Sequence, residues 1–314
     1  MRYPLAYEQL LYAFMLDRIH LIDTHFQAVP EAIAVFCIPH DQGALLIETG
    51  PGTVTETVAG RLDAMGLAPA DVTDVFVTHI HLDHAGAAGW WAEQGATVHV
   101  HEVGAPHLAD PSNLLKSATR IYGDDMDRLW GEMRPVPTAQ LNALADGDTV
   151  TVGDVTLEAL DTPGHAYHHH AYLLDGIAFT GDVAGVRLPG ALHMSPPLAP
   201  PEIDLDAWRA SIDRLRAQDL TYIAPTHFGL FTDAEDHLDR LANRLDAVEA
   251  FTEELMTSDP TDEDIETAVT DWLRSEAEAD GVEGPLWTRY ETANPSWMAA
   301  MGLKRFWQKH RADA

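Results

Sequence analysis

The segment THIHLDHAG, residues 78–86, constrains this chain more than any other feature, because His79, His81, Asp83 and His84 fall within six positions. The three residues before it, 75–77 (VFV), are apolar and β-branched or aromatic, as in a buried strand. Hydration favours scattering such polar groups over the surface, so their clustering at the end of a buried strand needs a specific cause. Bound cations are such a cause, because imidazole and carboxylate groups are common metal ligands.

The spacing within the segment indicates two neighbouring sites. In extended backbone alternate residues face the same side, so His79 and His81 can point to one spot. Asp83 and His84 come at the following turn, where the chain can direct them to a second spot, and Gly86 gives the backbone freedom to begin a helix. One segment could therefore supply ligands to two cations.

Three further candidate ligands each follow an apolar, strand-like segment. His165 lies in TPGH after 155–160, Asp182 in FTGD after 177–180, and His227 in PTHFG after 221–225. All could therefore meet at the same rim of a sheet. Three imidazoles suit Zn²⁺ with one open position, and imidazole with carboxylate also suits Fe or Mn.

The segment THIHLDHAG resembles the HxHxDH signature of the metallo-β-lactamase fold superfamily. The match continues through ETGPG (48–52), TPGH (162–165), FTGD (179–182) and THFG (226–229), in the superfamily's order, over roughly residues 30–230. The resemblance implies an α/β fold, a four-layered αββα sandwich with a dinuclear site at the sheet edges. We expect this domain over residues 1–230 and a C-terminal helical extension, packed on it, over 231–314.

The resemblance also implies a ligand set and cofactors. It assigns one metal to His79, His81 and His165, a second metal to Asp83, His84 and His227, and a bridging position to Asp182. The expected cofactors are two divalent ions, zinc first, with iron or manganese as alternatives. Glu48 departs from the Asp that the superfamily often has in its DTG turn, and we expect it still to orient a ligand or the backbone.

Two cations about 3.5–4 Å apart lower the pKa of a bridging water toward neutrality. The predicted function is therefore a metal-dependent hydrolase whose metal-bridging hydroxide attacks a small ester, thioester, lactone or phosphoester, with Asp83 as the catalytic residue that orients it. Two alternatives stay open: a mononuclear iron oxygenase of the persulfide dioxygenase kind, and a non-catalytic metal-binding sensor.

Residue types narrow the branch of the superfamily. A true β-lactamase commonly has a cysteine ligand, but the single cysteine, Cys37, lies in the apolar run IAVFCI and is expected in the core. Acyl-homoserine lactonases often carry Tyr three residues after the bridging Asp, where this chain has Gly185. The chain is most similar to the glyoxalase-II-like branch, although its acidic tail over 233–283 argues against binding glutathione.

The sequence offers fewer candidates for substrate contacts than for metal ligands. Arg187, five residues after Asp182, could orient an anionic substrate or form a structural ion pair. His168 and His169 follow His165 closely, and His169 is the one predicted to reach the substrate. His193 is a further candidate for the pocket.

Composition bears on partners and location. The formal net charge is −31, from 50 acidic and 19 basic residues. Repulsion at this charge disfavours nucleic acid and anionic membranes, so a small-molecule substrate is expected. The apolar stretch LLYAFML near the start is preceded by Glu8 and is too short for a membrane span, and it does not read as a signal peptide. We therefore expect a cytoplasmic protein.

The last part of the chain changes character after His227. Apolar residues recur at helical spacing from Leu238 to Leu255. We expect this helical tail to meet segments 104–146 and 186–203 and close one side of the active site. The resulting pocket would have an apolar wall and an acidic exterior, and it would favour small neutral or singly charged substrates. The tail could also form a homodimer interface.

Overall fold

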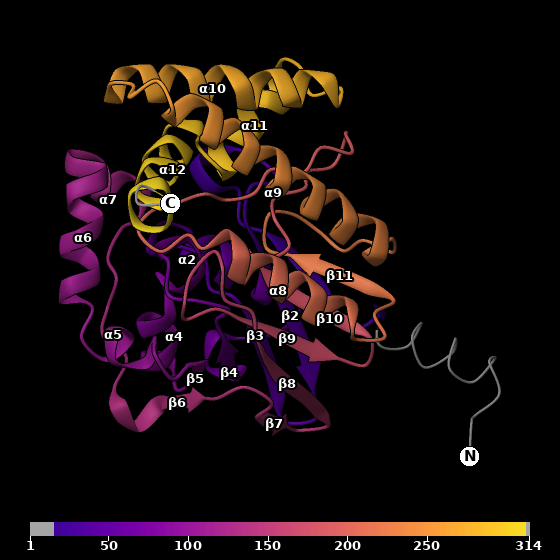
Figure 1. Ribbon diagram of the computed structural model, residues 1–314. Coiled ribbons are helices and arrows are strands. Elements are labelled where there is room, and N and C mark those ends of the chain that lie inside the picture. Colours follow the sequence, from indigo (N-terminus) through magenta and orange to yellow (C-terminus); the bar gives the residue numbers. More distant parts are fainter. Residues whose placement is uncertain (1–15, 312–314) are drawn as a thin grey trace.

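The computed structural model describes residues 16–311, in which two β-sheets lie face to face with helices on both outer sides (Figure 1). The first sheet has the order β1-β2-β3-β4-β5-β6. Its first three strands are antiparallel and the rest are parallel. The strands are β1 His20–Asp23, β2 Ala34–His40, β3 Gly43–Ile47, β4 Val72–Phe76, β5 Thr97–His101 and β6 Leu141–Leu144.

The second sheet has the order β11-β10-β9-β8-β7. It is antiparallel except for the parallel pair β10 and β11. Its strands are β7 Thr149–Val152, β8 Val155–Asp161, β9 His170–Leu174, β10 Ile177–Gly181 and β11 Tyr222–Pro225. The segments 155–160, 177–180 and 221–225, predicted to be strand-like, correspond to β8, β10 and β11, whereas β1 and the edge strand β6 were not predicted.

The strand residues alternate between two cores. In β2, Val35 and Cys37 pack in a core with the outer helices, whereas Phe36 and Ile38 pack between the sheets. A side-chain period of two places neighbours on opposite faces, and both faces of this strand are buried. Cys37 is fully buried, as expected, and burial raises the pKa of its thiol to about 12.

Helices cover both outer faces and complete the four-layered αββα sandwich. On the first sheet, α2 (Thr55–Ala64) and α4 (Ala88–Gln94) bury Val58, Leu62 and Trp91. On the second sheet, α8 (Leu205–Arg216) buries Trp208 and Ile212, and the side chain of Asp204 caps its N-terminus by accepting from two backbone N–H groups.

A helical segment follows β5 and lies to one side of the sandwich (Figure 1). It comprises α5 Ala105–Ala109, α6 Ser112–Tyr122, η4 Gly123–Asp125 and α7 Met126–Leu129. The short α3, Leu82–Ala85, belongs to the histidine-rich motif. Short 3₁₀ helices lie at Phe26–Ala28 (η1), Gly52–Val54 (η2), Pro69–Asp71 (η3) and Thr138–Gln140 (η5).

Four helices form the C-terminal part: α9 Ala234–Met256, α10 Asp262–Ala279, α11 Pro285–Ala293 and α12 Ser296–His310. The stripe predicted from Leu238 onward is buried against α8 and the second sheet in one core. Helix α10 packs against α12, and both lie with α11 above the sandwich in Figure 1. Within this part, the ring of Trp272 stacks on Phe251 at 4.6 Å, a packing role.

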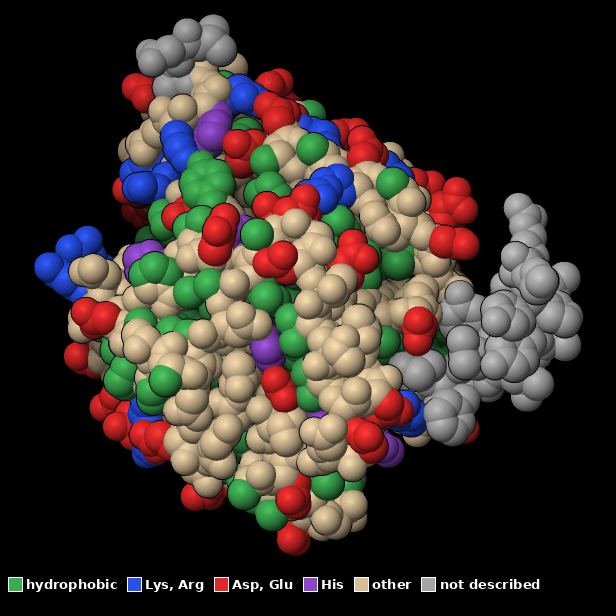
Figure 2. Space-filling model, turned by 90° about the horizontal axis from the view of Figure 1, so that it is seen from below, with side chains coloured by type: hydrophobic (Ala, Val, Ile, Leu, Met, Phe, Trp, Pro, Cys, Tyr) green, Lys and Arg blue, Asp and Glu red, His purple; other side chains and the backbone are tan. Residues whose placement is uncertain are grey.

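Acidic side chains are scattered over the face seen in Figure 2, among fewer basic ones. None of the helices between residues 16 and 311 combines the length and apolar character needed to cross a bilayer. The stretch LLYAFML falls, except for Leu16, outside the described residues.

Helix α12 approaches the loop before α8 so closely that only glycine fits. A Cβ on Gly302 would lie 1.9 Å from the carbonyl oxygen of Leu198, whereas one on exposed Gly60 in α2 would meet nothing within 4 Å. We predict that Gly302→Ala lowers the free energy of unfolding by about 1–3 kcal/mol through overpacking. Gly60→Ala should raise it by up to about 1 kcal/mol, because alanine has the higher helix propensity.

Thermal and urea unfolding followed by circular dichroism measures both variants beside the wild type. Equal stabilisation of the two alanine variants would show that α12 can move away from Leu198 at no cost.

Candidate metal centre

The seven predicted ligands come together where strands of both sheets end. The first four follow β4: His79 and His81 lie in the turn, and Asp83 and His84 are on α3. His165 follows β8, Asp182 follows β10 and His227 follows β11. The side chains fall into two adjacent groups, His79, His81, His165 and Asp182 in one and Asp83, His84 and His227 in the other.

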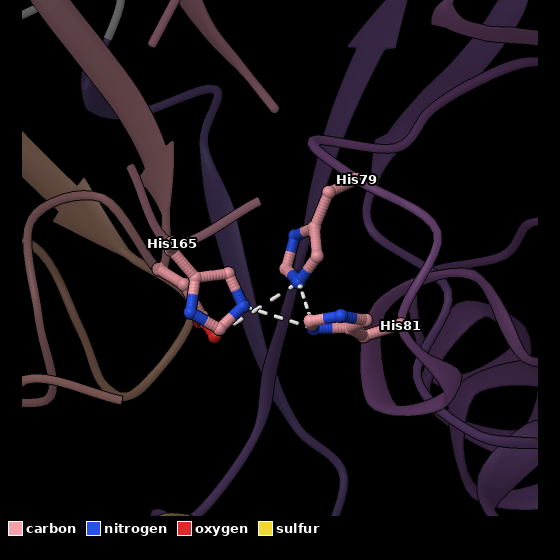
Figure 3. A group of neighbouring side chains, drawn as sticks. His79, His81 and His165 are labelled. Carbon is pink, nitrogen blue, oxygen red and sulfur yellow. Dashed lines mark hydrogen bonds and ion pairs between the residues drawn. The ribbon is translucent and has the colours of Figure 1, made fainter. Parts of the chain in front are cut away.

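In the first group three imidazole nitrogens point at one another (Figure 3). His81 Nδ1 lies 2.9 Å from both His79 Nε2 and His165 Nε2. Asp182 Oδ2 lies 3.2 Å from His165 Nε2 and 3.9 Å from His79 Nε2. One atom from each of the four side chains lies within 4.8 Å of the others.

In the second group Asp83 Oδ2 is 3.5 Å from the Nε2 atoms of both His84 and His227. The other oxygen of Asp182, Oδ1, is 3.2 Å from His84 Nε2 and 3.4 Å from His227 Nε2. Asp182 therefore stands between the groups, with one carboxylate oxygen toward each.

The outward nitrogens of the histidines are held by acceptors. Nδ1 of His165 donates to the carbonyl oxygen of Pro197 at 2.7 Å, and Nδ1 of His227 donates to that of Ala32 at 2.7 Å. Nδ1 of His84 donates to Glu48 Oε1 at 2.9 Å. In the neutral form of each imidazole the single N–H is then at Nδ1, and the inward Nε2 presents a lone pair.

This arrangement fits a metal centre. His84 Nε2 and Asp182 Oδ1 are among the buried side-chain atoms that have no hydrogen-bond partner in the described part of the chain. Buried polar atoms are normally satisfied, and orphaned lone pairs facing one another are costly unless a cation accepts them. The donor set of imidazole and carboxylate suits zinc, iron or manganese.

Glu48 ties three of the motifs together from behind. Its carboxylate accepts from His84 Nδ1, from Thr78 Oγ1 at 2.6 Å and from Thr226 Oγ1 at 3.0 Å. These partners belong to THIHLDHAG and PTHFG, so one buried carboxylate orients segments that are 148 residues apart in sequence, from 78 to 226. The orienting role expected for Glu48 is present in the structure.

The two groups differ in electrostatics. In the first, burial and the neighbouring imidazoles lower the pKa of His79 and of His81 well below the ordinary value. In the second, burial would lower the pKa of His84, but the carboxylates of Asp182, Asp83 and Glu48 raise it well above that value. Burial opposes ionisation of Asp182 as well, yet His84 and His165 hold its pKa below the usual range.

A cavity lies beside the two ligand groups, and none of the three predicted substrate contacts, Arg187, His169 and His193, lines it. Arg187 is buried and forms a bidentate pair with Asp233, at 2.8 and 3.0 Å, with its guanidinium over the ring of Phe231. It therefore takes the structural role that the sequence left open. His193 donates from Nδ1 to Asp280 at 2.8 Å and joins its loop to the end of α10.

His169 lies on the side of the ligand cluster away from the cavity. Its Nε2 accepts from the backbone N–H of Asp182 at 3.2 Å, and Nδ1 is bonded to Thr162 Oγ1 at 2.8 Å. It therefore positions Asp182. The neighbouring His168 does line the cavity. Both residues precede strand β9, which begins at His170.

A cavity of about 620 Å³ opens on both groups. His81, Asp83, His165 and Asp182 lie in its wall. The C-terminal part contributes residues of α11 and the start of α12, among them Glu291, Trp297 and Met298, so the tail borders the site. Segment 186–203 contributes Pro197 and 199–202, and α6 presents one face.

The residues on α6 were not identified from the sequence. A signal was present, because Leu114, Ala118, Ile121 and Tyr122 are three or four positions apart, as on one face of a helix. Such a face alone cannot be distinguished from ordinary core packing. That this face of α6 lines the cavity is seen only in the tertiary structure.

Comparison with known proteins places the fold and the motifs in one family. The family model of the metallo-beta-lactamase superfamily matches residues 29–227. A metallo-beta-lactamase fold-containing protein of Sulfurisphaera tokodaii is 26% identical over 68% of this chain and 80% of its own length. A hydroxyacylglutathione hydrolase of Aeromonas hydrophila is 28% identical over 47% of this chain and 45% of its own.

Two further matches differ in how much of each chain they cover. An atrochrysone carboxyl ACP thioesterase of Aspergillus fumigatus is 24% identical over 62% of this chain, but only 37% of that enzyme is covered. The crystal structure of a metallo-beta-lactamase family protein from Thermus thermophilus has a TM-score of 0.65 at 20% identity and covers 94% of this chain and 95% of its own. That likeness includes the C-terminal helices. On the family match and the fold together, this chain belongs to the metallo-beta-lactamase superfamily.

Proposed function

We propose that this protein is a hydrolase that uses two divalent metal ions to cleave a small ester, thioester, lactone or phosphoester. The observation that carries the proposal is the position of Asp182, whose two oxygens face different ligand groups. His79, His81 and His165 would hold one ion, Asp83, His84 and His227 the other, and Asp182 would be shared. Zinc is the first candidate, with iron or manganese as alternatives.

When bound, two such ions lower the pKa of water toward neutrality and polarise the bond to be cleaved. The protein's own groups complete the site. Burial opposes ionisation of Asp83, but His84 and His227 hold its pKa well below the usual range. Asp83 also lies in the cavity wall. It is therefore an ionised acceptor on the substrate side, suited to orient an attacking water.

The relatives support hydrolysis as the reaction class. Two of them carry the names hydroxyacylglutathione hydrolase and atrochrysone carboxyl ACP thioesterase. The presence of the complete second group, Asp83, His84 and His227, favours two ions over a mononuclear oxygenase. A sensor without catalysis is the remaining alternative.

The test is a metal-loaded sample assayed against neutral esters, thioesters, lactones and phosphoesters, with metal content measured on the same sample. Turnover of any of these that a chelator abolishes and metal restores supports the proposal. Two bound metals with no turnover across the panel would favour the sensor, and one iron with O₂ uptake would favour the oxygenase.

The ligand assignment predicts metal loss on substitution. His81→Ala removes a ligand of the first group, and about one equivalent of metal should be lost. Asp182→Ala removes the shared carboxylate and should weaken both sites. Elemental analysis after dialysis measures this, with exposed His20→Ala as the matched control. Two retained equivalents in both ligand variants would refute the assignment.

Glu48 is predicted to act through His84 without touching the metal. Glu48→Gln keeps the size of the side chain but places an amide N–H₂ among donors. Loss of such a supporting partner typically weakens metal affinity about 10–100-fold. We expect this loss at the second site, measured by competition with a chromogenic chelator. Exposed Glu56→Gln on α2 is the control, and equal affinities in the two variants would show that Glu48 is not needed.

The rate should depend on pH through the water that becomes the nucleophile. We expect kcat/KM to rise about tenfold per pH unit below an apparent pKa near 7 and to level off above it. Metal content is checked at each pH, so that acid loss of metal is not mistaken for titration. A flat profile between about pH 5 and 9 at constant metal content, with chemistry rate-limiting, is the contrary result.

A further inference from the structure

We propose, on the basis of the function proposed above, that the substrate carries an uncharged apolar acyl or alkyl group, and that this group lies between α6 and the start of α12. This narrows the substrate from four classes of bond to a neutral, lipophilic ester, thioester or lactone, and it excludes phosphoesters.

The apolar face of α6 is turned to the cavity. Leu114, Ala118, Ile121 and Tyr122 line it, and all except Ala118 are only half-buried. An apolar helix face normally packs against the protein, because leaving it in water forfeits about 25 cal/mol per Å². Here that face borders an open space continuous with the metal centre.

The opposite wall comes from the far end of the chain. The ring of Tyr122 lies 5.9 Å from that of Trp297, and its hydroxyl is 3.2 Å from Met298 Sδ. Figure 1 shows α12 beside α6 and α7. The floor is aromatic too, because Phe26 stacks on Trp130 at 5.5 Å and both line the cavity.

Apolar residues continue to the ligands themselves. Ile80 and Leu82 alternate with His81 and Asp83 in the motif, and all four line the cavity. If the bond to be cleaved lies at the metal centre, the acyl or alkyl group attached to it would therefore contact apolar side chains directly.

The charges in the cavity oppose an anionic substrate. Arg128 is the one Lys or Arg among the described residues that line it. Its guanidinium is bonded to Asp125 at 2.8 Å and to Gln27 at 3.0 Å. Away from the ligands the wall also carries Glu202 and Glu291, so phosphates or extra carboxylates would find repulsion and no unpaired cation.

The size of the cavity indicates a large group. A volume of about 620 Å³ lies within the usual range for small-molecule sites and far exceeds the need of an acetyl group. Each methylene that leaves water strengthens binding, so the rate should grow with chain length until the cavity is filled.

The first experiment compares p-nitrophenyl acetate, butyrate, octanoate and decanoate on the metal-loaded protein. We expect kcat/KM to rise at least tenfold from acetate to octanoate. A matched pair, the octanoyl thioesters of N-acetylcysteamine and of glutathione, tests charge. The neutral thioester should be preferred at least tenfold.

A matched pair of variants locates the effect on α6. Ile121→Asp places a carboxylate in the cavity wall, whereas Thr119→Asp adds the same charge to an exposed position on the same helix. Ile121→Asp should lower kcat/KM for octanoate at least tenfold more than it lowers that for acetate. Thr119→Asp should change neither. If Ile121→Asp does not fold, Leu114→Gln is the milder change on the same face.

A binding readout separates this inference from the hydrolase proposal. The uncharged fluorophore N-phenyl-1-naphthylamine should bind at one site per chain, with or without metal, and octanol should displace it. Ile121→Asp should weaken this binding at least fivefold, and Thr119→Asp should not.

The outcomes are distinct. Cleavage of the acetate ester with no gain for octanoate and no saturable dye binding overturns the apolar site and leaves the hydrolase. Saturable, displaceable dye binding with no cleavage of any ester, thioester, lactone or phosphoester supports the apolar site and removes the hydrolase.

Discussion

The structure depends on one constraint: five imidazoles and two carboxylates are gathered at one rim with their inward atoms facing one another, and all of them except His81 and Asp83 are buried. Without cations these inward polar atoms would be desolvated and incompletely hydrogen-bonded, which costs free energy in a marginally stable fold. With cations the same atoms become ligands. The hydrogen bonds behind them, from His165 to Pro197, His227 to Ala32 and His84 to Glu48, already set the tautomers that ligation requires.

The αββα sandwich supplies this cluster because strand ends from both sheets reach one rim. β4, β8, β10 and β11 each deliver a ligand segment as they end. Glu48, directly after β3, joins THIHLDHAG to PTHFG across the two sheets, and His169 holds the backbone of Asp182. Glu48 thus links the two sheets where the ligands must be placed most accurately, and His169 fixes Asp182 within the second sheet.

The metal centre and the cavity follow different physical requirements. The centre needs a few polar atoms at fixed positions, and its residues are spaced by strand geometry. The cavity needs apolar area, which comes from α6, η1 and α12, elements outside the two sheets. The same body can therefore present one reaction centre to different substrates as these surrounding helices change, as is general for folds that host many functions.

The sequence by itself predicted the cluster of candidate ligands, because ligand spacing is local: a strand followed by a turn brings His79, His81, Asp83 and His84 close together. It also determined the family, the two-sheet body and the helical tail, through periodicities of two and 3.6. It did not predict β1 and β6, the short strands at the two edges of the first sheet. It left the role of Arg187 open, and it did not predict the partners of Arg187, His193 and His169. These partners, Asp233, Asp280 and the Asp182 N–H, are set by packing. Only the tertiary structure decided what the substrate meets, because the cavity joins residues 114–122 to 297–298, and no local pattern specifies a contact across such a separation.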